Sequence, residues 1–189
     1  MIRLTALTIA AGICLPPAAA LGNPVKSLYT TVDLRTCKRL AAEGPRTAWR
    51  CSGLAGMPVY VAKGGPKQFV SAGAEAEKQR AASQTLGAAN SNFAPGSRRA
   101  TIEWRFERRG AKQLPYAMIV RFHTLGGERA GDVLVVLKAN ARESCHVAHI
   151  AALANNDAIA RARAIADRQA RTFDCRQEPT AESGGSGPM

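Results

Sequence analysis

The sequence predicts an α+β protein, with an antiparallel sheet of about six to eight short strands, a C-terminal helix packed on it and two disulfides. Three observations support this fold class. Short segments that alternate apolar and polar residues recur between glycine- and proline-rich turns, which is typical of antiparallel strands. One segment near the C-terminus spaces its apolar residues three and four apart, as a helix does. The four cysteines outside the N-terminal leader are an even number, which suits two disulfides.

Residues 1–20 have the pattern of a secretory signal peptide. Arg3 supplies a positive start, Leu4–Leu15 an apolar run, and Ala18–Ala20 the small residues of a cleavage site. The run has about twelve residues, fewer than the ~20 that a membrane-spanning helix needs. We therefore expect a periplasmic or secreted protein with no transmembrane segment after cleavage. A lipid anchor at Cys14 is the alternative, although the residue before it is not small, as lipidation normally requires.

Cleavage leaves residues 21–176 as a single α+β domain and residues 177–189 as a disordered tail, which ends in Ser-Gly-Gly-Ser-Gly-Pro-Met. A domain of this length buries about two-thirds of the surface of its unfolded chain. The disulfides are therefore expected to assist a hydrophobic core rather than replace one.

The first half of the domain is predicted to form four short strands followed by a less regular segment. The expected strands are Leu28–Leu34, Thr47–Cys51, Pro58–Ala62 and Lys67–Ser71. Turn residues at Glu43–Pro45 and Gly64–Pro66 separate them. The segment Ala74–Leu86 has good helix formers but few large apolar residues, so we expect a marginal surface helix, followed by a loop at Gly87–Ser97.

The second half is predicted to form a meander of strands closed by a helix. The expected strands are Ile102–Phe106, Tyr116–Phe122, Val133–Leu137 and Cys145–Ile150. Val133–Leu137 is apolar on both faces and is therefore expected to be central. The helix is capped by Asn155 or Asn156, and its apolar face contains Ile159, Ala162, Ile165, Ala166, Gln169 and Phe173.

The cysteines permit three pairings, and the predicted strands favour the sequential one by proximity. Cys37 and Cys51 flank a chain segment that turns back on itself. Cys175, just past the helix, can reach Cys145 on the strand before it, which would lock the helix to the sheet. The larger loop corresponds to a stabilisation of about 3–4 kcal/mol in the loop-entropy treatment.

The chain is strongly basic, with a net charge of +12, or +11 once Arg3 is removed with the leader. Such a charge attracts anionic partners, among which an envelope polymer or lipid headgroup suits the expected compartment. The alternative is that the charges form a solvated face. We expect no nucleic acid as partner, because the chain lacks a run of five or six basic residues and its aromatic content is 5%.

Two groups of residues are candidates for a binding surface. Trp49, Tyr60 and Trp104 would suit a groove for a glycan or peptide, or they belong to the core. The basic residues around one predicted hairpin, Arg105, Arg108 and Arg109, would suit an anionic partner, or they discourage edge-to-edge pairing of the sheet.

The sequence gives no catalytic or metal signature, and we expect no cofactor. His146 and His149 are three apart in a predicted strand, so their side chains are expected on opposite faces. His123 stands alone at the end of its strand. The chain contains no Gly-x-Ser-x-Gly elbow, and Gly64–Pro66 lacks the lysine and helix of a phosphate-binding loop.

The segment Trp49–Val59 has the pattern Trp-x-Cys-x-Gly-x-x-Gly-x-Pro-Val. Together with Tyr29–Asp33, Ile102–Arg105, Pro115–Ala117 and the helix before Phe173, it resembles a group of small secreted bacterial proteins of unknown function. The resemblance covers most of the mature chain. It implies export, paired cysteines and one domain, and it implies no activity.

A second resemblance concerns the order of Trp49–Cys51, Val59–Val61 and Val70–Gly73, which is similar to that in bacterial envelope inhibitors of animal-type lysozyme. It implies an enzyme inhibitor. The charge argues against it, because these lysozymes are cationic and a cationic inhibitor would be repelled at encounter.

These patterns together predict a non-catalytic binding module for an anionic envelope component or a protein partner. The alternative is an inhibitor of a host or envelope enzyme, for which a protruding loop such as Gly87–Ser97 would be needed. A catalyst would instead show a polar cleft with a histidine or a carboxylate in it.

Overall fold

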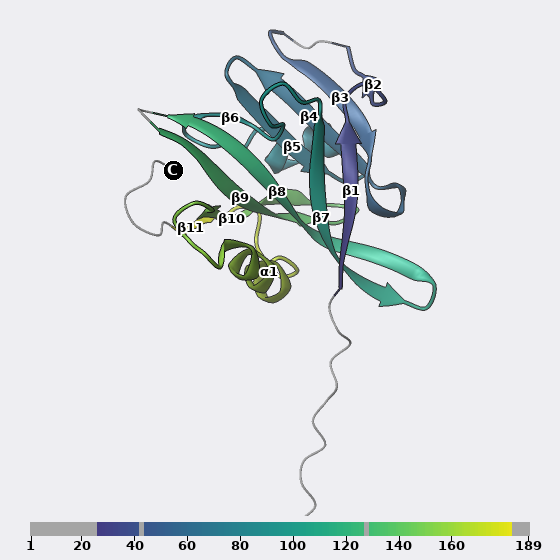
Figure 1. Ribbon diagram of the computed structural model, residues 1–189. Helices are drawn as coiled ribbons and strands as arrows, with labels where there is room; N and C mark the ends of the chain where they lie inside the picture. The colour runs from purple at the N-terminus through teal and green to yellow at the C-terminus, as the bar shows by residue number, and fades with distance from the viewer. Residues whose placement is uncertain (1–25, 42–43, 127–128, 183–189) are drawn as a thin grey trace, which may run out of the picture.

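The computed structural model describes residues 26–41, 44–126 and 129–182, and it consists of two β-sheets and one α-helix (Figure 1). The larger sheet has the order β1-β7-β8-β9-β10-β11, and β6 also pairs with β8. Its strands are β1 (Lys26–Asp33), β6 (Ala89–Ser91), β7 (Arg99–Arg109), β8 (Lys112–Gly126), β9 (Arg129–Ala139), β10 (Ser144–Ala151) and β11 (Thr180–Glu182).

The smaller sheet is a meander of four strands in the order β2-β3-β4-β5. Its strands are β2 (Lys38–Arg39), β3 (Thr47–Ser52), β4 (Pro58–Gly64) and β5 (Lys67–Ala72). The helix is α1 (Ala158–Gln169), and the 3₁₀ turns are η1 (Leu54–Gly56), η2 (Ala76–Lys78) and η3 (Arg80–Ala82). Figure 1 shows α1 and the smaller sheet on opposite sides of the larger sheet.

The hydrophobic core lies mainly between the two sheets. Val59, Val61 and Val70 of the smaller sheet pack against alternate residues of β7, β8 and β9, such as Trp104 and Val135. The period of two in these strands places one face of each sheet in this core. A second apolar cluster on the other face of the larger sheet buries Ala158, Ala162, Ile165 and Ala166 of α1, so the large sheet is covered on both faces.

The predicted fold class is confirmed in its coarse form, since the chain is mostly β-sheet with one α-helix and two disulfides. The structure differs from the expectation of one sheet, because the first strands form a separate layer. The pair β10 and β11 is parallel, and β11 lies inside the expected disordered tail. β9 pairs with one edge of β10, and the chain after Cys175 pairs with the other edge as β11. The signal peptide and Cys14 lie outside the described residues.

Two predicted segments are also corrected. Residues 74–86 form the short turns η2 and η3 instead of a surface helix. Within η2 and η3 only alanines are buried, which anchors single turns and no continuous helical face. The loop expected at Gly87–Ser97 contains the short strand β6.

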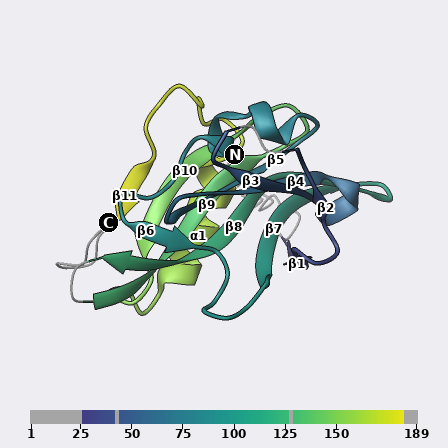
Figure 2. The ribbon, with the colours of Figure 1, turned by 90° about the horizontal axis from the view of Figure 1, so that it is seen from above.

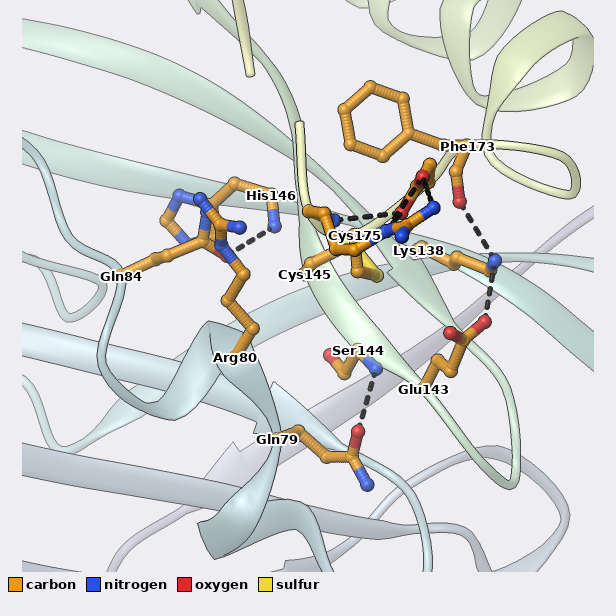
Figure 3. Close-up of a disulfide and its surroundings, with 12 residues drawn as sticks. Gln79, Arg80, Gln84, Lys138, Glu143, Ser144, Cys145, His146, Phe173 and Cys175 are labelled. Carbon is orange, nitrogen blue, oxygen red and sulfur yellow. Dashed lines mark hydrogen bonds and ion pairs between the residues drawn. A yellow bond between two sulfur atoms is a disulfide. The ribbon is translucent and has the colours of Figure 1, made fainter. Parts of the chain in front are cut away.

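Both predicted disulfides are confirmed. Cys37 and Cys51 have their Cα atoms 4.6 Å apart, and Cys145 and Cys175 have theirs 5.6 Å apart. Figure 3 shows the second disulfide close to Lys138, whose ammonium donates to the carbonyl of Phe173 at 2.9 Å and pairs with Glu143 at 2.7 Å. The segment after α1 is therefore attached to the sheet by a covalent bond and by a charge-assisted hydrogen bond.

The contact between the two sheets is tightest at Trp104. Its indole is 0% exposed, and the indole N–H donates to Thr30 Oγ1 at 2.7 Å. A Cβ atom at Gly53 would lie 2.5 Å from Trp104 Cζ2 and 2.9 Å from Val59 Cγ2. Only glycine fits between this indole and β4 without displacing one of them.

We expect Gly53→Ala to lower the free energy of unfolding by about 1–3 kcal/mol, the usual cost of overpacking a core. Urea denaturation followed by fluorescence measures this change. The neighbouring Ser52→Ala is the control, because Ser52 is exposed and its substitution should stay within about 0.5 kcal/mol. A Gly53→Ala protein as stable as Ser52→Ala would contradict the contact.

Candidate functional site: a cationic groove beside a break in the sheet

One edge of β8 is shared by two strands, and the chain leaves the sheet between them. Ser91 of β6 pairs with His123, whereas the register of β7 begins again at Ile102 opposite Val120. Residues 92–98 swing away from the sheet between these two pairings and return as β7 (Figure 2). The excursion supplies one wall of a surface groove.

This groove, which we call the cationic groove, has a volume of about 690 Å³. It lies between residues 93–98, the end of β8 and the smaller sheet. Its lining includes Arg39, Trp49, Lys63, Phe93, Arg98 and His123. The groove therefore combines side chains from both sheets and from the loop that joins β6 to β7.

The lining of the groove is positively charged. Arg39, Lys63 and Arg98 are exposed there, and the lining contains no Asp or Glu. Within the described part of the chain, none of the three cations forms an ion pair. Nearby Asp33 does not neutralise them, because Arg35 and Arg99 bind its carboxylate and hold the pKa of Asp33 well below its usual range. The cations are thus left to a ligand or to solvent.

The disulfide Cys37–Cys51 fixes the position of one groove cation relative to the groove tryptophan. Arg39 is directly opposite Trp49 in the pairing of β2 with β3. The same register pairs Lys38 with Arg50, and the disulfide joins Cys37 and Cys51, which would be opposite each other if the register continued by one further position. A slip of β2 along β3 would require this bond to break, so the placement of the guanidinium near the indole is enforced covalently.

Buried amide side chains hold the wall of the groove in place. Gln68 Oε1 accepts a hydrogen bond from the backbone N–H of Asn92 at 2.6 Å, and Asn90 Oδ1 accepts one from the N–H of Gln68 at 3.2 Å. The side chain of Asn90 also donates to Thr85 Oγ1 and to the carbonyl of Ala88. These bonds tie β5 of the smaller sheet to β6 of the larger one. The loop of residues 93–98 therefore starts from a backbone position that these hydrogen bonds hold in place.

The structure does not bring the three aromatic candidates together. Trp49 lines the cationic groove, but Trp104 lies in the core. Tyr60 is next to Val61, the partner of Trp49, and its side chain therefore projects from the other face of the smaller sheet. There Tyr60 lines a second cavity of about 680 Å³, which contains the ion pair of Arg50 with Glu77. Of the two alternatives for these residues, Trp104 belongs to the core, and Trp49 and Tyr60 line different cavities.

Arg105 has a structural partner and is not at the surface. Its side chain is 5% exposed, and its guanidinium donates to both oxygens of Asp167 on α1, at 2.8 and 2.7 Å. Tyr116 donates to the same carboxylate at 2.7 Å. Burial, and then this hydrogen bond, raise the pKa of Tyr116 to about 12. Arg105 therefore holds the helix on the sheet.

Arg108 and Arg109 are exposed near the end of the hairpin formed by β7 and β8, together with Lys112. We refer to these three residues as the hairpin cations. Arg109 is 3.3 Å from Glu107, a carboxylate that also binds Arg171. The hairpin cations thus form a second basic surface, separate from the lining of the cationic groove.

The two neighbouring histidines of β10 correct another expectation. His146 Nδ1 and His149 Nε2 are 2.8 Å apart, so both side chains are on one face of the strand. The cause is a bulge, because the pairing of β10 with β9 skips Val147 between His146 and Ala148. Among the described residues, no three His, Cys, Asp or Glu side chains gather as metal ligands. His146 is 1% exposed, and burial, reinforced by His149, lowers its pKa to about 3.

Acidification should therefore destabilise the fold through His146. In the unfolded chain this histidine takes up a proton as the pH falls below about 6.5, whereas the native side chain stays neutral. The free energy of unfolding should fall between pH 7 and pH 5, by at most about 1.4 kcal/mol per pH unit for this group. His146→Gln should reduce the slope of this dependence in urea titrations, and His149, whose pKa burial also lowers, should keep part of it. A slope equal to that of the wild type would contradict the assignment.

Comparison of the chain with protein-family models, with curated proteins and with solved structures gave no match. The two resemblances seen in the sequence gain no support from these comparisons. No helix in the described residues has the length and apolar character needed to cross a bilayer.

No motif in the sequence identifies Arg39 or Lys63 as a groove residue. For Arg39 the cysteines give an indirect indication. If the predicted Cys37–Cys51 bridge joins opposed strand positions, then Arg39 is opposite Trp49. Lys63 and Arg98 reach the groove through the packing of the two sheets and through the loop, and no local pattern indicates either.

Proposed function

We propose that the protein is exported and that it binds an anionic envelope polymer in the cationic groove. The observation that carries the proposal is the set Arg39, Lys63 and Arg98, which surround Trp49 without a carboxylate in the lining. Three cations along one groove suit a chain with repeated negative charges better than a single small ion. An indole at the same place offers a broad apolar surface to the uncharged part of each repeating unit.

Two further features support this class of ligand. The groove wall is held by buried hydrogen bonds and by a disulfide, so little ordering entropy is lost when a ligand binds. Two disulfides also suit the oxidising compartment in which envelope polymers occur. An inhibitor needs a protruding loop, whereas residues 93–98 line the groove.

The test compares two triple variants of the full chain that remove the same charge. One is Arg39→Gln with Lys63→Gln and Arg98→Gln in the groove, and the other replaces the hairpin cations Arg108, Arg109 and Lys112 by Gln. The probe is poly(glycerol phosphate), and calorimetry measures its dissociation constant at several salt concentrations.

We expect the groove variant to bind at least about tenfold more weakly, since three lost ion contacts of about 0.5–1 kcal/mol each add up to that factor or more. Its salt dependence should also flatten, and the hairpin variant should change the dissociation constant less than about twofold. Equal losses in both variants would show that net charge alone governs binding. No binding by the wild type would overturn the proposal for this polymer class.

A further inference from the structure

Three side chains with complementary chemistry stand in one row across the sheet at the edge of the cationic groove. Ser91 on β6 is directly opposite His123 on β8, and His123 is directly opposite Asp132 on β9. Opposed residues of antiparallel strands project from the same face with their Cβ atoms about 4.5–5.5 Å apart. The register therefore places a hydroxyl, an imidazole and a carboxylate side by side, although the sequence separates them widely.

The carboxylate orients the imidazole. Asp132 Oδ1 is 2.8 Å from His123 Nδ1, and Asp132 Oδ2 accepts a hydrogen bond from Arg121 at 2.8 Å. With the Nδ1 proton directed at the carboxylate, the lone pair of a neutral imidazole is on Nε2. No group among the described residues bonds that nitrogen. The His123 side chain is 31% exposed, and the residue lines the cationic groove, so the imidazole is partly open to solvent.

The hydroxyl is on the other side of the imidazole from the carboxylate, because β6 and β9 flank β8. Ser91 also lines the groove. Its Oγ donates to the carbonyl of Phe93 at 2.9 Å and accepts from the N–H of Phe93 at 3.0 Å. The bond from the N–H fixes the oxygen in the groove wall. Ser91 Oγ bonds Phe93 and not His123 in this structure, so the hydroxyl must exchange its bond with the Phe93 carbonyl for one with the imidazole when a reactant binds.

We propose that Ser91 is a nucleophile, that His123 is its general base and that Asp132 is a positioning residue, so that the groove transfers an acyl group from an anionic ester. As Oγ forms its bond with the carbonyl carbon, its proton passes to Nε2 of His123. The ester C–O bond then breaks, and the leaving alkoxide takes that proton. Water attacks the acyl-serine in the same way and releases the acid and the free hydroxyl.

The substrate class follows from the lining that Ser91 and His123 share with the three cations. Arg39, Lys63 and Arg98 favour an ester whose alcohol or acid part carries negative charge. This activity goes beyond binding, and it uses the same groove as the proposed function. Its test uses an uncharged probe, so that failure of anion binding and failure of the chemistry are seen separately.

The experiment treats the folded full chain with an uncharged alkyl fluorophosphonate. The probe forms an Oγ–P bond, and fluoride and the hydroxyl proton leave. Intact mass and peptide mapping should find one adduct, on Ser91, and Ser91→Ala should abolish it. His123→Gln should slow labelling at least about tenfold, given the 10²–10⁴-fold that a general base contributes. Ser97→Ala is the matched control, since Ser97 lines the same groove in a similar local turn, and it should label normally.

Asp132→Asn should slow labelling and shift its dependence on pH, which loss of structure alone would not do. No adduct on the wild type, an adduct elsewhere, or an unchanged rate in His123→Gln would overturn the inference. Peptide mapping of the wild-type adduct needs no substitution, so it tests the role of Ser91 even if a variant fails to fold. If poly(glycerol phosphate) binds while Ser91 stays unlabelled, only this inference fails.

Discussion

The packing of the two sheets against Trp104 is the constraint on which the rest of the structure depends. The indole fills the space between the layers, and Gly53 leaves room for it. This contact sets how closely the smaller sheet approaches the larger one. Trp49 and Lys63 reach the groove from the smaller sheet, and the loop that carries Arg98 belongs to the larger sheet. A shift of one layer relative to the other would therefore separate the cations that share the groove.

The distribution of charge explains why this groove stands out. Each Asp or Glu side chain that the structure describes has a basic partner. Several of these pairs connect separate elements of the fold. Arg105 with Asp167 and Arg163 with Glu103 join α1 to the larger sheet. Because the carboxylates are used in this way, the surplus of basic residues is left unpaired. In the groove that surplus gathers next to an indole.

Local patterns in the sequence predict the strands and disulfides well, and they predict layers and sites poorly. Alternation of apolar residues identifies segments such as Ile102–Phe106 because each strand buries one face. It does not say which sheet a strand joins, and so the separate layer of β2 to β5 is not foreseen. The bulge at Val147 reverses the expected faces of the two histidines. Arg105 has the same sequence signature as an exposed arginine, and only Asp167 on a distant helix makes it internal.

The site depends even more on long-range contacts. Ser91, His123 and Asp132 have no sequence motif in common, and the register of three strands alone aligns them. The groove exists because β6 and β7 share one edge of β8. That arrangement depends on pairing and on the amide contacts of Gln68, neither of which a local pattern encodes.

If the groove around Trp49 concentrates anions, collisional quenching of tryptophan fluorescence reveals this without a ligand. The chain has two tryptophans, and Trp104 is buried, so quenching by dissolved ions reports on Trp49. Relative to its quenching of free tryptophan, we expect iodide to quench more strongly than caesium at equal ionic strength. The difference should vanish in Trp49→Phe and should shrink when Arg39, Lys63 and Arg98 are replaced by Gln. Equal relative quenching by the two ions in the wild-type protein would contradict this concentration of anions.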